Sequence, residues 1–274
     1  MHKLIIQIAE HQLEINVASA FLKDWLVAKF HATEIMDCSQ LGSSDLTILI
    51  EDGYGTPFES FDVNISTTPE LITYLRNDYR IQVFRDFTHA YISAYDDFAL
   101  NHALLLLYSG FIAHHGWGLM THSSCIMSEG HAYLFAGQSG AGKSTAALLS
   151  SPRMVLSDEA ALVKVTDNSV RIYNSPFRSD SFWEREQMNE SYELKGYHIL
   201  RQSQQIKRHP VQKAEAMIFL MNTIFYWAFL PEETAKVVAM CRKLVNNVTF
   251  YELYFQKNNL FWEVIHEHTH EQYV

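Results

Sequence analysis

The segment Gly137–Ser144, with the sequence GQSGAGKS, constrains the fold of this chain more than any other part. It matches the pattern G-x-x-x-x-G-K-[ST], in which glycines let the backbone turn tightly and point several N–H groups at anionic oxygens. The segment follows the apolar stretch HAYLFA and opens the Ala- and Leu-rich stretch STAALLS. A strand, a glycine-rich loop and a helix in this order predict a phosphate-binding loop.

Two side chains of this segment have specific expected roles. Lys143 is expected to reach the β and γ phosphates of a nucleotide, and Ser144, or else Thr145, to offer a hydroxyl to Mg²⁺. The positive N-terminal end of the following helix is expected at the same place. We therefore expect nine residues to bind the nucleotide: Gly137, Gln138, Ser139, Gly140, Ala141, Gly142, Lys143, Ser144 and Thr145.

A phosphate loop alone does not separate a GTPase, an ATPase, a nucleotide kinase and a protein kinase. The chain has no N-K-x-D segment of the kind that reads guanine, and no arginine-rich lid follows the loop. These two absences weaken the interpretations as a GTPase and as a nucleoside-monophosphate kinase.

Residues on both sides of the loop carry more information. His122 lies fifteen residues before Gly137, on the strand that we expect to pair with the one feeding the loop. Asp158 and Glu159 end an apolar strand about fifteen residues after Lys143. An acid there can hold Mg²⁺ or take a proton from an attacking hydroxyl, and a histidine close to it can hydrogen-bond it.

The segments HSSCIMSEGHAYLFAGQSGAGKST and VLSDEAALV together resemble the catalytic core of the HPr kinase/phosphorylase group, whose fold is similar to that of phosphoenolpyruvate carboxykinase. In that group a histidine begins the strand pair before the loop, and an Asp-Asp pair follows the loop. VRIYNSPFRSD is similar to a segment G-[TS]-P-[FW] of shorter members of this superfamily, which modify ribosomally made peptides and include the kinases of lasso-peptide pathways. The resemblance covers roughly residues 95–265.

The resemblance implies a role for each matching residue. Lys143 and the loop amides would bind the β phosphate, and Ser144 would bind Mg²⁺. Asp158 would be the base that deprotonates a substrate hydroxyl, supported by His122. Glu159 stands where the group has a second aspartate, and it is a further candidate metal ligand. The HPr kinase signature segment after the acidic pair is not recognisable, so HPr itself is not the expected substrate.

Arg178, in SPFRSD, is a further candidate catalytic residue. A guanidinium group there could neutralise charge on a transferring phosphoryl group. The alternative is an arginine of a solvated loop.

We expect an α/β protein in two parts. Residues 1–95 are expected to form a small α+β module without a catalytic signature, including a short helix over residues 70–77. The resemblance implies that residues 96–274 form a phosphoenolpyruvate carboxykinase-like P-loop domain, mostly β with packed helices. Apolar spacing in that domain predicts a long helix over 209–230 and a C-terminal helix over 258–270.

Composition narrows the expected partners and location. The net charge is −10 and the basic residues form no stripe, which disfavours nucleic-acid binding. Cys38, Cys125 and Cys241 are far apart, as is typical of a reducing compartment. The most apolar stretch, residues 103–113, is too short to span a bilayer, and the N-terminus lacks a signal-peptide pattern. We expect a cytoplasmic protein with neither a nucleic-acid nor a membrane partner.

These patterns favour an ATP- and Mg²⁺-dependent kinase that phosphorylates a hydroxyl, with serine as the favoured acceptor, of a small protein or a ribosomally made peptide. One alternative is a non-catalytic nucleotide-binding accessory protein of a peptide-maturation pathway, and another is a small-molecule kinase or carboxykinase. Asp158 together with His122 favours catalysis, because binding alone needs neither. The sequence leaves open GTP or pyrophosphate as the donor, the identity of the acceptor, and a possible homo-oligomer.

Overall fold

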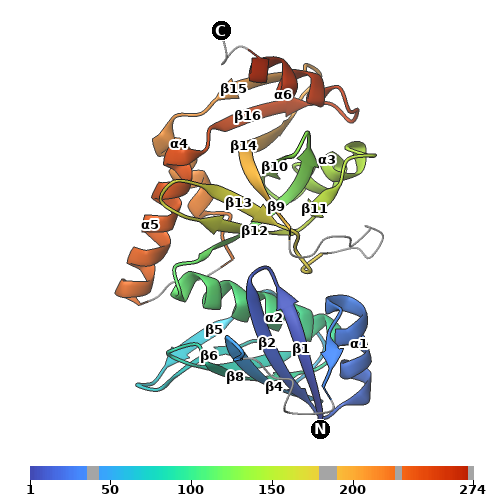
Figure 1. The fold of residues 1–274 in the computed structure, drawn as a ribbon, viewed down its shortest axis with the longest axis vertical. Coiled ribbons are helices and arrows are strands. Elements are labelled where there is room, and N and C mark those ends of the chain that lie inside the picture. Colours follow the sequence, from blue (N-terminus) through green and yellow to red (C-terminus); the bar gives the residue numbers. More distant parts are fainter. Residues whose placement is uncertain (36–42, 179–189, 226–229, 271–274) are drawn as a thin grey trace. The chain divides into compact units, whose positions relative to one another are not determined.

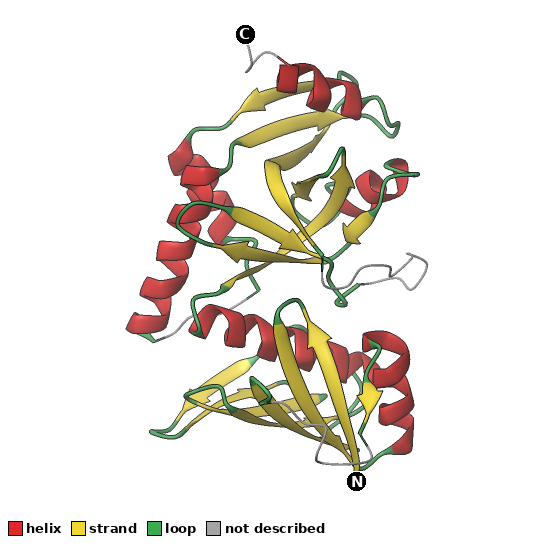
Figure 2. Ribbon diagram, in the orientation of Figure 1, coloured by secondary structure: helices red, strands yellow, loops and turns green. Residues whose placement is uncertain are grey.

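The computed structural model of the chain describes residues 1–35, 43–178, 190–225 and 230–270, with side chains described as far as residue 266. The chain forms two compact units, Met1–Phe111 and Ile112–Val274. Within the described residues it is a mixed α/β protein, mostly sheet, with six helices (Figure 2). The expected α/β class is therefore confirmed at this level.

The first unit is built on one eight-stranded sheet. Its strands are β1 His2–Ile8, β2 His11–Val17, β3 Thr33–Glu34, β4 Leu46–Asp52, β5 Asn64–Thr67, β6 Leu71–Leu75, β7 Tyr79–Phe84 and β8 His89–Ala94. The strand order is β3-β1-β2-β4-β8-β7-β6-β5. Buried residues alternate along β1, β2 and β7, as expected of strands that place one face on a core.

Two helices accompany this sheet, α1 Ala20–Phe30 and α2 Asp97–His114. The Ser19 hydroxyl caps α1 by accepting a hydrogen bond from the backbone N–H of Leu22, at 3.4 Å. The Tyr108 hydroxyl of α2 donates to the Ile8 carbonyl at 3.1 Å, which ties this helix to the first hairpin.

The helix expected over residues 70–77 is wrong. Leu71–Leu75 forms β6, which pairs antiparallel with β5 and β7. Ile72 and Tyr74 are buried on one side while their neighbours are more exposed. This spacing of two residues fits a strand, and long-range pairing decides the conformation of so short a segment.

The second unit holds a sheet that closes partly on itself. Its strands are β9 Gly118–Ser128, β10 His131–Ala136, β11 Val155–Ser157, β12 Ala160–Val165, β13 Val170–Tyr173, β14 Ser191–Gln202, β15 Lys207–Pro210 and β16 Phe250–Phe255. The order is β10-β9-β12-β13-β14-β16-β15, and a further pairing of β10 with β14 closes a ring of five strands.

Three strands of this sheet run parallel. β10 pairs parallel with β14, and β14 pairs parallel with β16, whereas the other pairings within the sheet are antiparallel. The carboxyl ends of β10, β14 and β16 therefore meet at one edge of the sheet. The glycine-rich loop leaves the sheet at this edge.

Four helices pack around the sheet: α3 Lys143–Leu149, α4 Lys213–Met221, α5 Pro231–Asn247 and α6 Phe261–His270 (Figure 1). One apolar core joins α4 and α5 to strands, and a second joins α3 and α6 to β10, β14 and β16. The Trp262 indole of α6 donates to the Ser150 hydroxyl at 3.0 Å, directly after α3. No helix of the described chain is long and apolar enough to cross a membrane.

The long helix expected over residues 209–230 is also wrong in its extent. α4 ends at Met221, and Ile224 forms a β-bridge with Thr121 of β9. The last part of the expected helix, residues 226–229, lies outside the described residues. Apolar spacing alone did not reveal that this segment leaves the helix to run beside a strand.

Candidate active site

The glycine-rich loop and the flanking residues surround one cavity of about 350 Å³, which we call the acid cavity. It brings together the predicted histidine, both predicted acids and most of the loop. Its lining residues are His122, Ser139, Gly140, Gly142, Lys143, Ser144, Thr145, Asp158 and Glu159.

The loop has the backbone that its glycines predict. Gly140 and Gly142 have φ values of +78° and +109°, a region that favours glycine. A β-carbon at Gly142 would lie 2.7 Å from Cζ of Phe255, so glycine also allows a close approach of that ring. The Lys143 ammonium group donates to the Gly137 carbonyl at 3.0 Å and to the Gln138 carbonyl at 3.4 Å, and so lies over the loop.

Strand β9 positions the parts of the acid cavity. Its Ser123 pairs with Ala136 of β10, so the preceding residue, His122, lies level with the start of the loop. His122 also pairs with Ala160, the residue that follows the two acids. The backbone N–H of Ser123 donates to the Glu159 carbonyl at 3.0 Å. One strand thus holds both the histidine and the acidic turn beside the loop.

A buried serine joins the same strand to the helix that follows the loop. The Ser124 hydroxyl donates to the Lys143 carbonyl at 2.9 Å. Ser124 is fully buried, so this hydrogen bond is shielded from water. It fixes the backbone at the end of the loop relative to β9.

His122 lies in a partly buried environment that disfavours its charged form. The Phe225 ring meets it edge-on, with the ring centroids 5.5 Å apart, and its backbone N–H donates to the Thr223 carbonyl. Burial first, and then the charge of Lys143, lower the pKa of His122 to about 4. The imidazole is therefore neutral at pH 7.

Lys143 is affected by burial as well. Desolvation lowers the pKa of its ammonium group from the ordinary value, and the nearby negative charge of Glu159 opposes this change. This electrostatic contact links the loop lysine to the acidic turn. The lining of the cavity therefore combines one cation, two carboxyl groups and a neutral imidazole.

The oxygen atoms of the acid cavity suit a hard cation. Ser144, Asp158 and Glu159 all line it, and hydroxyl and carboxylate oxygens are the ligands that Mg²⁺ prefers. No three His, Cys, Asp or Glu side chains gather as a metal-binding group within the part of the chain that the structure describes. A magnesium ion would thus depend on phosphate oxygens as well, as is usual for nucleotide sites.

Arg178, the further candidate catalytic residue, is not among the residues that line this cavity. Its side chain is 2 % exposed and donates to the Ser175 carbonyl at 3.0 Å and to the Leu156 carbonyl at 3.4 Å. It also donates to the Asn174 side chain. These contacts join the residues that follow β13 to β11, the strand that directly precedes Asp158. Arg178 therefore stabilises the backbone next to the acidic pair.

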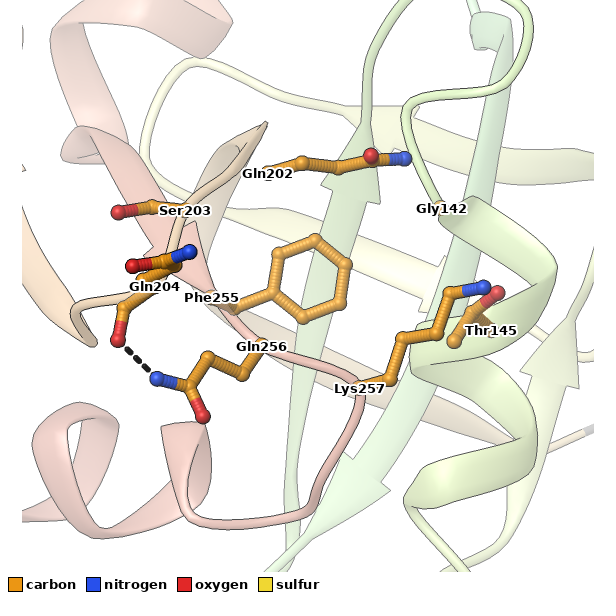
Figure 3. A pocket seen from close by; sticks show the side chains of 8 residues that line it. All are labelled: Gly142, Thr145, Gln202, Ser203, Gln204, Phe255, Gln256 and Lys257. Carbon is orange, nitrogen blue, oxygen red and sulfur yellow. Dashed lines mark hydrogen bonds between the residues drawn. The ribbon is translucent and has the colours of Figure 1, made fainter.

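A second cavity of about 650 Å³ adjoins the loop, and the sequence patterns did not reveal it. We call it the amide cavity, because three glutamine side chains line it (Figure 3). Its lining residues are Gly142, Thr145, Gln202, Ser203, Gln204, Phe255, Gln256 and Lys257. The only available signal was the glutamine-rich segment RQSQQ, which carries no known motif.

The fold and the site define a mixed α/β protein whose glycine-rich loop faces an acidic pair and a histidine. The family model described as SynChlorMet cassette protein ScmC matches residues 96–270, and the chain belongs to this family. The comparison with curated proteins finds no match. Among solved structures, the HPr(Ser) kinase/phosphatase from Coxiella burnetii is similar at 9% sequence identity with a TM-score of 0.33, over 56% of this chain and 97% of that one.

Proposed function

We propose that this protein is a kinase that transfers the γ-phosphoryl group of ATP to a hydroxyl, with serine as the favoured acceptor, of a small protein or ribosomally made peptide. The observation that carries the proposal is the acid cavity, where Lys143, Asp158 and His122 line the same space. The sequence resemblance to the HPr kinase/phosphorylase group supports it. We further propose that residues 96–274 have the carboxykinase-like P-loop core that this resemblance implies.

The proposed reaction is a direct displacement at phosphorus. The acceptor oxygen forms a bond to the γ phosphorus, and the bond from this phosphorus to the β–γ bridging oxygen breaks. The electron pair of that bond leaves with ADP. The hydroxyl proton passes to the carboxylate of Asp158, which is 5 % exposed and lies in the lining of the cavity.

The other residues bind and orient in this proposal. The Lys143 ammonium group and the loop N–H groups face the negative charge of the phosphates. His122 is neutral at pH 7, so it offers a hydrogen bond near the acids without adding a charge. Ser144 and Glu159 would hold Mg²⁺, which when bound offsets charge on the β and γ phosphates.

The test is transfer from γ-labelled ATP. The purified protein is incubated with Mg²⁺, labelled ATP and each short peptide encoded beside its gene, and the products are analysed by mass spectrometry. The proposal predicts a gain of one or more phosphates on a peptide hydroxyl. If ATP binds but every such peptide and the protein itself stay unmodified, the alternative of a non-catalytic accessory protein is favoured.

A further inference from the structure

We propose that the amide cavity binds the nucleoside of the phosphoryl donor, so that the donor is a purine nucleoside triphosphate and not pyrophosphate. This inference rests on the proposed function, because it takes the acid cavity as the site of the transferred phosphate.

The two cavities are continuous in their lining. Gly142 and Thr145 contribute to both, so a molecule bound along the loop can extend from one into the other. The amide cavity, at about 650 Å³, is the larger of the two. Ligand pockets for small molecules span roughly 300–1,000 Å³, so it is large enough for a purine nucleoside.

The position in the sheet supports a ligand site. Gln202 ends β14 and Phe255 ends β16, and these two residues are paired in the parallel ladder. The residues that follow them, including Gln204 and Lys257, complete the lining. The cavity therefore lies beyond the carboxyl ends of parallel strands, the edge at which α/β sheets bind their ligands.

The chemistry of the amide cavity fits a nucleoside. Its eight lining residues include no Asp or Glu, and only Lys257 carries a charge. Glutamine amides both donate and accept, as the edges of a purine and the ribose hydroxyls require. The Phe255 ring, which is 3 % exposed, lies between the glutamines and Lys257 and contributes apolar atoms to the lining (Figure 3). A two-ring base has the larger apolar surface to place against it.

The direction of phosphoryl transfer indicates which cavity would hold the acceptor and which would hold the leaving nucleoside diphosphate. In an in-line displacement the acceptor and the leaving group lie on opposite sides of the phosphorus. The candidate base, Asp158, lines the acid cavity, so the acceptor hydroxyl must approach from there. The leaving nucleoside diphosphate then points toward the side that has no acid, across Gly142 and Thr145.

One hydrogen bond couples the amide cavity to the loop. The Gln202 side chain donates from Nε2 to the Gly140 carbonyl at 2.7 Å. Gly140 belongs to the lining of the acid cavity. Gln202 therefore acts in this proposal as a positioning residue that holds the loop against the end of β14.

The test compares equilibrium binding of two kinds of ligand by calorimetry in the presence of Mg²⁺. One kind is the non-hydrolysable β,γ-imido analogue of ATP or of GTP, and the other is inorganic tripolyphosphate, which has the same phosphate chain without a nucleoside. The wild-type protein is expected to bind at least one analogue at least ten times more tightly than tripolyphosphate.

A pair of tryptophan variants locates the effect. Gln204→Trp fills the amide cavity at an exposed lining residue, whereas Gln205→Trp places the same side chain at the next exposed residue, outside the lining. We expect Gln204→Trp to weaken the analogue at least tenfold and to leave tripolyphosphate within twofold, and Gln205→Trp to change neither.

Each other outcome has a distinct meaning. If tripolyphosphate and both analogues bind the wild type equally, the inference is wrong, while phosphoryl transfer at the acid cavity, which the transfer assay tests separately, still stands. If Gln204→Trp leaves the tighter analogue unaffected, the nucleoside binds elsewhere and the inference is also wrong. If no ligand binds to the folded protein, both the inference and the proposed function are wrong.

Discussion

The acid cavity and the amide cavity share Gly142 and Thr145 in their linings, yet their chemistry differs. The acid cavity holds two carboxyl groups, a lysine and a neutral histidine in about 350 Å³. The amide cavity is nearly twice as large and is lined mainly by uncharged groups. Most of the charged side chains thus line the acid cavity, whereas the amide cavity has only Lys257 as a charged residue.

If both proposals hold, this difference shows how one loop can serve two tasks. Groups that act on developing charge must be few, held rigidly and shielded from water. Groups that read a base and a sugar need area and both donors and acceptors. Changes in one cavity are therefore expected to affect transfer, changes in the other to affect nucleotide selection, and changes in the shared wall to affect both.

The largest expected effect is on transfer from the acid cavity. Asp158→Asn keeps the shape of the side chain but cannot accept the hydroxyl proton. We expect the transfer rate to fall by about 100-fold or more, the usual contribution of a general base, with affinity for the ATP analogue within about twofold. Single-turnover transfer and calorimetry measure the two quantities.

The matched control is Asp167→Asn, another aspartate of the same unit. Asp167 is 80 % exposed in its side chain and forms an ion pair with Lys243, away from both cavities. It is expected to keep wild-type transfer. Full transfer activity in the Asp158→Asn variant would remove Asp158 from the mechanism.

The second largest effect is expected at the shared wall, which consists of the two residues that line both cavities, Gly142 and Thr145. Gly142→Ala places a β-carbon 2.7 Å from the Phe255 ring at a φ of +109°. We expect binding of the ATP analogue and of tripolyphosphate to weaken together, by about tenfold or more, because the loop must shift. Gly130→Ala has a similar φ of +77° and open space around it, so it controls for backbone strain alone. If Gly142→Ala weakened binding of the ATP analogue but not of tripolyphosphate, Gly142 would not support the phosphate site.

The position of the loop was predictable from sequence, and much of its surroundings was not. A tight turn of glycines depends on local geometry, and the pairing of β9 with β10 follows from a short hairpin. A position for His122 near the loop could therefore be expected from the sequence, and His122 lines the acid cavity. The surroundings of Arg178 could not be expected in the same way, because its side chain donates to the Leu156 carbonyl of a separate strand. The roles of the site residues stay predictions.

The amide cavity could not have been predicted for a related reason. It needs the ends of β14 and β16, which pair in parallel although Gln202 and Phe255 are far apart in the sequence. Parallel pairing over such a distance is set by the whole fold and leaves no local pattern. The same is true of the segment after Met221, where Ile224 pairs with Thr121 in place of continuing a helix.

A smaller expected effect concerns the free energy of unfolding and its dependence on pH. His198 of β14 is fully buried, stacks between Phe135 and Tyr251, and has a pKa lowered well below its ordinary value by burial. The unfolded chain therefore binds this proton more readily, and the free energy of unfolding should fall as the pH falls below about 6.5. Urea unfolding at several pH values between about 4.5 and 7, a range around the ordinary histidine pKa, measures how the free energy of unfolding changes with pH.

The variant His198→Phe keeps an aromatic ring in the stack and removes the titrating group. We expect a flatter dependence of stability on pH than in the wild type. His209→Gln changes an exposed histidine of the same unit and should leave the slope unchanged. An equal slope in wild type and His198→Phe would show that other groups cause the acid sensitivity.

The smallest expected effect is a shift in one titration. Burial and the charge of Lys143 place the pKa of His122 at about 4, so its imidazole stays neutral between pH 5 and 8. The ring C–H resonances, assigned by comparison with His122→Gln, should titrate with a midpoint about 4. A midpoint near the ordinary value would mean a charged imidazole beside the acids at mildly acidic pH.

The most direct measurement is a crystal structure of the Asp158→Asn variant with Mg²⁺ and the imido analogue of the tighter-binding nucleotide. The account predicts the γ phosphate in the acid cavity, between Lys143 and the side chain at position 158, and the nucleoside in the amide cavity beside Phe255. A nucleotide whose γ phosphate lies outside the acid cavity, with the side chains at 158 and 159 turned away from it, would contradict the assignment of phosphoryl transfer to this loop.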